Sequence, residues 1–316
     1  MSYDDEKGRH NLMKLWEHYH TPHTVDEALE LLQRYAGNAR IIAGGTDLLV
    51  DMRADPDSKP HPALIDVTAI AELCDITEAD GYAVIGAGVT HTQIVRANLM
   101  AQGATCLVES CGVVGGPQVR NVATLGGNVA HALPAGDGTT SLVALDAEVE
   151  IIHEGERKWV NILSMFRGAG QSLLDSSRDM LLRFRFKLAA ADEGTAFKRI
   201  MRPQGVALPV LGCAVWVRLN AERTHYAETR VSIAPVAPVP QRITAVEDIL
   251  NGQPTDESTL QRAIAAALET LNPRTSKYRA TADYRREMIE VLLKRTVPLA
   301  TQRARTGEAV PEGIGV

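Results

Sequence analysis

Residues 41–53 read IIAGGTDLLVDMR, an apolar strand pattern that passes through two glycines into a helical pattern. Such a junction at Gly44, Gly45 and Thr46 gathers free backbone N–H groups at one point, where the helix dipole also favours negative charge. Glycine suits this place because a Cβ would hinder both the dihedral angles and the approach of a phosphate oxygen. The stretch therefore predicts an anion cradle, with a plain strand-to-helix turn as the alternative.

A complete helix signal precedes this stretch. Thr24 and Glu27 have the spacing of a capping box, apolar residues then recur on one helical face, and Gly37 supplies the stop. Residues 54–62 are rich in proline and charge, and they predict a seam between two subdomains. The other elements expected in the first half are strands at 63–67 and 82–88 and a helix at 90–102.

The pattern changes in the second half of the chain. Two stretches alternate like antiparallel strands, with prolines at their ends, and two later stretches have the apolar spacing of helices. The strands are expected at 209–219 and 228–243, and the helices at 257–271 and 282–297. Strands followed by helices predict an α+β arrangement for this half.

Composition narrows the class of protein. The chain has 316 residues, so more than one domain is expected, and 45% hydrophobic with 23% charged residues is typical of a globular protein. A net charge of −6 without long basic runs argues against a nucleic-acid partner. We find no signal-peptide core and no apolar run of membrane-spanning length in the sequence, and we therefore expect a cytoplasmic protein.

The four cysteines favour a reducing compartment, since they are too few for a disulfide framework in a chain of this length. Cys106 and Cys111 have the C-x4-C opening of plant-type iron–sulfur sites. The next cysteine would be needed at position 114, which is valine. Buried free thiols are the expected state.

A second glycine-rich segment occupies residues 113–137, which read VVGGPQVRNVATLGGNVAHALPAGD and are expected to form a long loop. Gly126 and Gly127 again leave the backbone bare, so that it can approach a ligand closely. Asn128 offers both a donor and an acceptor, and Asp137 offers an acceptor. Two separate loops of this kind are suited to a long cofactor that contains two phosphates.

Other nucleotide motifs fit less well. Gly86 and Gly88 follow a strand and precede a helix, but His91 stands where a Rossmann fingerprint needs its third glycine. A P-loop motif does not occur in the sequence. The glycine pair of residues 41–53 and that of residues 113–137 are therefore the main candidates for cofactor binding.

Four segments together resemble one family. YHTPHTVDEALELL, IIAGGTDLLVDM, GPQVRNVATLGGNVAHALPAGD and DYRREM, in this order and spacing, are similar to the FAD-binding medium subunit of the molybdenum hydroxylases, the relatives of xanthine dehydrogenase, carbon monoxide dehydrogenase and 4-hydroxybenzoyl-CoA reductase. The resemblance runs from about Leu15 to Val297. It implies an α+β fold with a vanillyl-alcohol-oxidase-type (PCMH-like) FAD-binding domain of two subdomains and a C-terminal α+β domain. The implied ranges are 12–188 for the FAD-binding domain, with subdomains at about 12–58 and 59–188, then 192–300 for the sheet-plus-helices domain and 301–316 for a tail.

The resemblance also implies which residues bind FAD. In the family the first glycine loop holds the pyrophosphate. The matching positions here are Ile42, Ala43, Gly44, Gly45, Thr46, Asp47 and Leu48. The positions implied elsewhere are Val114, Thr124, Gly126, Gly127, Asn128, Asp137, Leu182 on the adenine side, and Lys198. A carboxylate beside a pyrophosphate is repelled, so we expect Asp47 to cap the N–H groups of the following turn or to accept from a ribose hydroxyl.

The resemblance further implies an electron-transfer subunit of an oxidoreductase complex. FAD would take electrons from 2Fe-2S clusters on a small partner subunit, beside a large molybdopterin subunit, in a heterotrimer and a dimer of it. The chain itself lacks the cysteines for such clusters, and no metal ligands are assigned to it. Two alternatives are a free-standing FAD-dependent oxidase or reductase and a scaffold that has lost its flavin. Neither the substrate nor the acceptor, whether NAD, quinone, ferredoxin or oxygen, follows from the sequence.

Two further groups of residues have open roles. His18, His20 and His23 lie close together but lack the spacing of a metal site, and His131 is expected either beside the isoalloxazine ring or as a hydrogen-bonded wall residue. The C-terminal arginines are expected on a solvated helix face or at a contact with a partner subunit. They are Arg279, Arg285 and Arg286.

Overall fold

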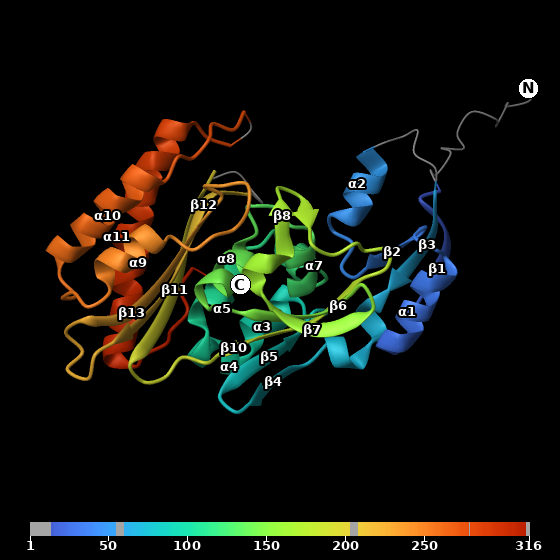
Figure 1. Ribbon diagram of the computed structural model, residues 1–316, viewed down its shortest axis with the longest axis horizontal. Helices are drawn as coiled ribbons and strands as arrows, with labels where there is room; N and C mark the ends of the chain where they lie inside the picture. The colour runs from blue at the N-terminus through green and yellow to red at the C-terminus, as the bar shows by residue number, and fades with distance from the viewer. Residues whose placement is uncertain (1–13, 55–59, 203–207, 278, 314–316) are drawn as a thin grey trace, which may run out of the picture.

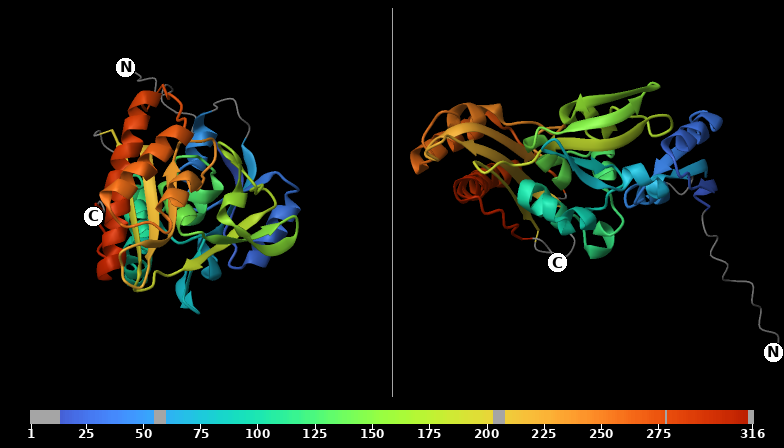
Figure 2. Two further views of the ribbon diagram at one scale, coloured as in Figure 1. Left: turned by 60° about the vertical axis from the view of Figure 1, so that its left-hand side comes forward. Right: turned by 90° about the horizontal axis from the view of Figure 1, so that it is seen from below.

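The computed structural model describes residues 14–54, 60–202, 208–277 and 279–313, and these form three units along the long axis of the molecule (Figure 1). The N-terminal unit and the C-terminal unit lie at opposite ends, with the central unit between them (Figures 1 and 2). The architecture is mixed helix and sheet, as expected. Among the described helices, none is both long enough and apolar enough to cross a membrane.

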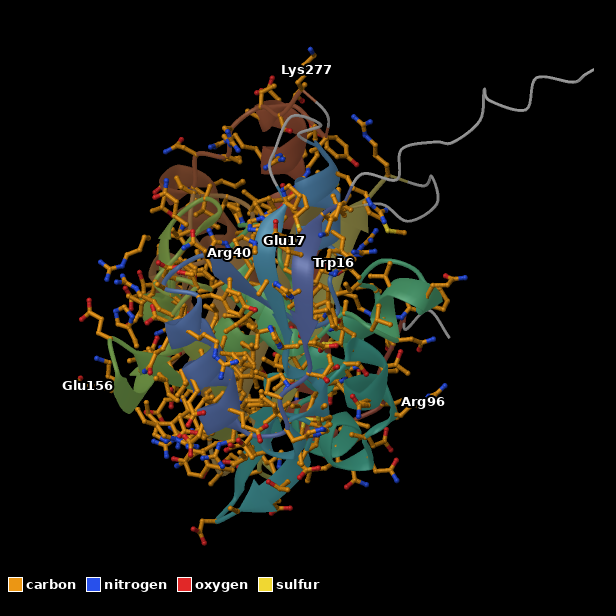
Figure 3. The ribbon with its side chains drawn as sticks, turned by 90° about the vertical axis from the view of Figure 1, so that its right-hand side faces the viewer. Trp16, Glu17, Arg40, Arg96, Glu156 and Lys277 are labelled. Atoms are coloured by element: carbon orange, nitrogen blue, oxygen red, sulfur yellow. The ribbon has the colours of Figure 1, made fainter. Side chains whose placement is uncertain are left out.

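The N-terminal unit is a parallel sheet of three strands in the order β1-β3-β2, with helices between them. Figure 3 looks onto this unit, with Trp16, Glu17 and Arg40 toward the viewer. Thr24 caps the first helix by accepting from the Glu27 N–H at 3.1 Å. The Glu27 carboxylate accepts from the His23 N–H, one residue earlier than in a capping box. The elements are β1 (Trp16–His20), α1 (Val25–Arg34), β2 (Ala39–Ile42), α2 (Leu48–Ala54) and β3 (His61–Asp66).

The central unit is an antiparallel sheet in the order β4-β5-β10-β6-β7, and helices pack on it. Its strands are β4 (Ile76–Ala79), β5 (Tyr82–Gly86), β6 (Glu148–His153), β7 (Glu156–Asn161) and β10 (Met180–Lys187), with a short hairpin of β8 (Phe166–Gly168) and β9 (Gln171–Ser172). Its helices are α3 (His91–Arg96), α4 (Asn98–Gly103), α5 (Thr105–Gly112), α6 (Pro117–Arg120), α7 (Leu125–Ala130) and α8 (Asp137–Ala144), with 3-10 turns η1 (Val67–Ala69), η2 (Ala71–Leu73) and η3 (Ile162–Met165).

Two expectations for this unit were wrong. The single helix expected at 90–102 is two helices, because Ala97 adopts an extended conformation between α3 and α4. The segment 113–137 is not one long loop, since it contains α6 and α7. Pro117 stands at the start of α6, and the Thr124 side chain caps α7 by accepting from the Gly127 N–H at 3.0 Å.

The C-terminal unit is an antiparallel sheet in the order β11-β12-β13, formed by β11 (Glu193–Met201), β12 (Pro209–Leu219) and β13 (Tyr226–Ala234). Its helices are α9 (Thr244–Leu250), α10 (Glu257–Thr270) and α11 (Ala282–Thr306). These helices cover one face of the sheet, and α5 and α8 of the central unit contact the strands from the other side. The sheet is therefore buried on both faces.

This unit also differs from expectation at two places. The second strand ends at Ala234, and α9, which was not expected, follows the proline-containing turn after it. Helix α11 runs to Thr306, six residues into the segment expected as a tail, and it ends where Gly307 takes the left-handed conformation with φ 74°. Glycine is well suited to that C-terminal position.

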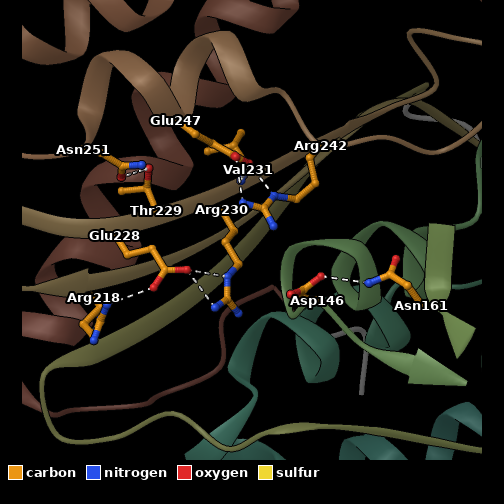
Figure 4. Close-up of polar contacts among 10 residues, drawn as sticks. All are labelled: Asp146, Asn161, Arg218, Glu228, Thr229, Arg230, Val231, Arg242, Glu247 and Asn251. Atoms are coloured by element: carbon orange, nitrogen blue, oxygen red, sulfur yellow. Dashed lines mark hydrogen bonds and ion pairs between the residues drawn. The ribbon is translucent and has the colours of Figure 1, made fainter. Parts of the chain in front are cut away.

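Polar contacts hold α9 against β13 (Figure 4). Arg242 donates to both carboxylate oxygens of Glu247 at 2.6 and 2.7 Å, and the Val231 N–H donates to the same carboxylate at 2.8 Å. On the neighbouring strands the carboxylate of Glu228 accepts from both Arg218 and Arg230. These side chains fix the turn after the sheet as well as the helix that follows it.

A buried ion pair joins the C-terminal unit to the central unit. Arg303 of α11 and Glu109 of α5 are 2.7 Å apart, with side chains only 5% and 1% exposed. Arg303 also donates to the Thr195 carbonyl at 2.7 Å, and Glu109 also accepts from the Phe197 N–H at 2.7 Å. The pair therefore connects α11, β11 and α5 at one point.

Candidate cofactor site

A cavity of about 460 Å³ lies where the three units meet. Most of the residues that the sequence assigned to FAD line it, although they come from segments far apart in the chain. The predicted residues in the lining are Ile42, Ala43, Gly44, Gly45, Thr46, Asp47, Leu48, Val114, Thr124, Gly127, Asn128 and Asp137. The structure thus brings the two glycine motifs to one pocket.

The first glycine loop meets the second segment directly. A Cβ at Gly44 would lie 2.2 Å from the Val122 carbonyl oxygen, so this glycine is required by the contact between the two loops. Gly45 has φ +66°, which favours glycine for the turn itself. Within the described chain, the backbone N–H groups of residues 44–47 donate to no protein acceptor. These groups are available to an anion beside the start of α2.

The second glycine motif works differently from our expectation. The Gly126 N–H donates to the Ala87 carbonyl, and a Cβ at Gly126 would lie 2.5 Å from that oxygen, so this glycine serves protein packing. The Gly127 N–H is taken by Thr124. A Cβ at Gly127 would meet only the Thr124 hydroxyl, at 3.3 Å. Gly127 therefore leaves space on the pocket side, but its own N–H is not free for a ligand.

Asn128 and Asp137 already have protein partners. The Asn128 side-chain oxygen accepts from the Thr139 N–H at 3.0 Å and from the Thr139 hydroxyl at 3.1 Å, which fixes α7 to α8. Asp137 pairs with Arg199 of β11 at 2.7 Å, and the two side chains are 5% and 10% exposed. Burial raises the pKa of the Asp137 carboxyl to about 6, although Arg199 acts in the opposite direction. The Asn128 side-chain oxygen is therefore engaged by Thr139, whereas Arg199 engages only the Oδ2 atom of Asp137.

The side chains of Leu182 and Lys198 lie outside the pocket lining. Leu182 is fully buried among the core residues beneath the N-terminal sheet. Lys198 pairs with Glu312 at 2.6 Å. Successive side chains of a strand point to opposite faces, so Arg199 enters the pocket while Lys198 points to the side of α11.

Comparison with known proteins identifies the family to which the chain belongs. The family model described as the FAD-binding domain in molybdopterin dehydrogenase matches residues 13–186, and the CO dehydrogenase flavoprotein C-terminal domain matches residues 195–299. The chain belongs to the FAD-binding subunits of the molybdopterin dehydrogenases. Like these relatives, it is a flavoprotein subunit of the oxidoreductase class.

The relatives are similar over nearly the whole chain. The xanthine dehydrogenase FAD-binding subunit of Escherichia coli O157:H7 is 31% identical over 291 residues, which cover 90% of this chain and 96% of the relative. The carbon monoxide dehydrogenase medium chain of Hydrogenophaga pseudoflava is 29% identical, covering 90% and 97%. A solved carbon monoxide dehydrogenase from the same organism superposes with a TM-score of 0.83 at 29% identity, again covering 90% and 97%. Quinoline 2-oxidoreductase from Pseudomonas putida 86 gives 0.81 at 25% identity, with the same coverage.

The pocket fits the FAD that this family binds. The free N–H groups of residues 44–47 suit a pyrophosphate, and the open side of Gly127 allows a close approach. Apolar side chains such as those of Val119, Leu133 and Pro209 offer apolar surface against which the rings of the cofactor can pack. Asp47 is exposed, and in the described chain its side chain makes no capping bond, so its predicted capping role is wrong and a ribose contact stays a prediction.

The sequence did not reveal several residues at this site. Arg199 and Gly212 face each other across the paired strands β11 and β12, and a Cβ at Gly212 would lie 3.5 Å from an Asp137 oxygen. His131, which was already expected at the cofactor from the sequence, lines the pocket as the C-cap of α7. Among the arginines with open roles, Arg279 lines the pocket, whereas Arg285 is buried and donates to the Pro235 carbonyl at 2.9 Å. Arg286 is exposed and donates to the Leu271 carbonyl at 3.3 Å.

One of the three N-terminal histidines has a side-chain hydrogen bond. His20 shares a hydrogen bond of 2.8 Å with the Tyr35 hydroxyl. In the described part of the chain, no group of three or more metal-ligating side chains comes together. Cys106, Cys111 and Cys213 are buried free thiols, as expected, and Cys74 is half-buried.

His91 is a buried wall of the pocket. Its ring is 1% exposed, and its Nδ1 has no hydrogen-bond partner. Burial and, to a lesser extent, the positive charge of Arg120 lower the pKa of the imidazole to about 4. His91 is therefore neutral at physiological pH and adds no charge to the site.

This low pKa makes stability depend on pH. The unfolded chain protonates His91 near its ordinary pKa of 6.5, whereas the folded chain keeps it neutral down to about pH 4. The histidine therefore contributes stability that is complete above pH 6.5 and is lost as the pH falls toward 4. Between pH 7 and 4.5 the wild type should lose about 2 kcal/mol more unfolding free energy than His91→Gln, as measured by urea denaturation. A difference that does not change with pH would contradict this.

Proposed function

We propose that this chain is the electron-transfer subunit of a multi-subunit molybdenum hydroxylase or dehydrogenase. Its FAD would receive electrons from 2Fe-2S clusters of a small subunit and pass them to an external acceptor. One observation supports the proposal most strongly: the loop that contains Gly44 and Gly45 and the loop that contains Gly126 and Gly127 come together at a single pocket with the C-terminal sheet. The relatives whose names describe xanthine dehydrogenase subunits and carbon monoxide dehydrogenase medium chains support it.

Different residues of the pocket would contact or position different parts of FAD. The N–H groups of residues 44–47 bind the pyrophosphate, and the open face of Gly127 allows the cofactor to lie against α7. Asn128 and Asp137 set the positions of α8 and Arg199. Bound FAD supplies the capacity to hold two electrons, while the protein supplies position and electrostatics. The FAD-binding part would have the vanillyl-alcohol-oxidase-type fold.

The partners would be the small 2Fe-2S subunit and the large molybdopterin subunit, in a heterotrimer that forms a dimer. In the described residues no three metal-ligating side chains come together, and Cys106, Cys111 and Cys213 are buried free thiols. The 2Fe-2S clusters of the proposal would therefore belong to the small subunit. The medium-chain name of the Hydrogenophaga pseudoflava relative supports such an assembly.

Purification under native conditions tests this proposal. The tagged full chain should be yellow, contain equimolar FAD that dithionite bleaches, and co-elute with a 2Fe-2S protein and a molybdopterin protein identified by mass spectrometry. A colourless chain that takes up no added FAD would contradict flavin binding. A chain that binds FAD and oxidises a substrate without partners would instead support the free-standing flavoenzyme.

A further inference from the structure

Two arginines from the C-terminal unit stand in the wall of the cofactor pocket. Arg199 lies on β11, and Arg279 lies in the connection before α11. The N-terminal unit, which carries the free N–H groups of residues 44–47, lies on the other side of α7 and α8 (Figure 1). The pocket thus has an anion cradle contributed by one unit and a pair of guanidinium groups contributed by another.

The charges at the arginine end do not cancel. Asp137 pairs with Arg199 at 2.7 Å and offsets one positive charge. The Arg279 guanidinium forms no hydrogen bond or ion pair in the described chain, although the residue is half-buried. Burial and the nearby Arg274 lower the pKa of Arg279, while the charge of Asp137 acts in the opposite direction. Arg199 and Arg279 share the single negative charge of Asp137, so the arginine end of the pocket carries net positive charge.

We propose that this end of the pocket receives the isoalloxazine ring of FAD, and that Arg279, with Arg199, binds the reduced ring more tightly than the oxidised ring. The proposal rests on the proposed function, because it requires FAD in the pocket. Oxidised isoalloxazine is neutral, and the addition of two electrons and one proton leaves one negative charge on it. An unpaired cation in a partly buried wall favours that charged form.

Adenine and the pyrophosphate are less suitable ligands for the arginine end of the pocket than the isoalloxazine ring. Adenine stays neutral in both redox states, so it gains nothing from an unpaired charge. The pyrophosphate has the free N–H groups of residues 44–47 and the start of α2, which come from the N-terminal unit. Only the isoalloxazine ring changes its charge between the oxidised and reduced states. A nearby arginine can therefore bind its two states with different affinity.

The test compares oxidised and reduced FAD on the full chain. Oxidised FAD affinity is measured by titration, and the flavin midpoint potential by dye equilibration, which together give the affinity for reduced FAD. Arg279→Met should weaken the reduced form about tenfold more than the oxidised form, lowering the potential by about 30 mV for two electrons. Asp137→Asn should shift the potential upward, because it removes the charge that offsets Arg199.

Arg286→Met is the matched control, since it removes an exposed arginine at the start of α11 that does not line the pocket. Its relative affinity for the two forms should change less than twofold. If Arg279→Met weakens both forms equally and leaves the potential unchanged, the arginine serves the phosphates or adenine and the inference is overturned. If the wild-type chain binds no FAD, the proposed function itself fails.

Discussion

Replacement of Gly45 by valine is expected to weaken FAD binding at least about 100-fold while the chain remains folded. Gly45 has φ +66°, a conformation that a β-branched residue adopts only with strain of about 1–3 kcal/mol. Its Cβ would also lie 3.0 Å from the Ile42 Cδ1 atom and 3.2 Å from the Leu49 Cδ1 atom. Relief of these contacts must move the loop whose N–H groups face the pocket. A 100-fold loss corresponds to about 2.7 kcal/mol of binding free energy.

Gly81→Val separates strain from cofactor binding. Gly81 has φ +78° in the turn between β4 and β5, and a Cβ there meets no atom within 4 Å. Both variants carry the backbone strain of a positive φ, but only Gly45→Val should lose FAD, as measured by fluorescence titration of the apoprotein. Undiminished FAD binding by Gly45→Val would show that residues 44–47 are not the pyrophosphate site.

Replacement of Arg303 by methionine is expected to lower the unfolding free energy by about 3–5 kcal/mol. The change leaves the Glu109 carboxylate buried at 1% exposure without its cation. It also removes the donor to the Thr195 carbonyl. Loss of the ion pair should therefore weaken the contact between the central and C-terminal units, so that the two units can unfold independently, and should also destabilise each unit. Urea denaturation followed by circular dichroism measures the change, and a second transition would reveal independent unfolding of the two units.

Lys294→Met on the same helix provides the comparison. Lys294 pairs with Glu290 at 2.7 Å, but both side chains are about two-fifths exposed, at 42% and 41%. Water screens such a pair, and its removal should cost no more than about 0.5 kcal/mol. Equal losses from Arg303→Met and Lys294→Met would mean that the buried pair contributes nothing beyond an ordinary surface pair.

Local signals explain what the sequence predicts correctly in the fold. Helix α1 has a capping threonine and one apolar face, and the strand before Gly44 has a continuous apolar pattern, so both follow from short-range rules. Helix α5 lacks such a signal because all its residues, Thr105–Gly112, are buried and leave no polar stripe. Helix α7 contains two glycines, which weaken helix propensity, and it depends on tertiary contacts such as that between Gly126 and Ala87.

The same distinction applies to the site. The glycine motifs and Asp137 lie in recognisable stretches, and the structure places them at one pocket. Arg199 and Arg279 could not be assigned in this way, because packing of a distant sheet and of the connection before α11 brings them there. Strand alternation offered one usable signal, since Lys198 and Arg199 are adjacent and only one of them can face the cofactor.

The contact between Gly44 and the Val122 carbonyl changes how relatives of this protein should be interpreted. A descendant that had lost FAD would still need glycine at position 44, and equally at position 126, because an added Cβ would lie only 2.2 and 2.5 Å from neighbouring carbonyl oxygens. Glycine at positions 44 and 126 therefore indicates that the fold is preserved, and it does not by itself indicate that FAD is bound. At position 127 a Cβ would meet only the Thr124 hydroxyl, so a side chain there occupies the cofactor's space with little cost to the scaffold, and substitutions at this position distinguish an assembly protein from a working flavoprotein.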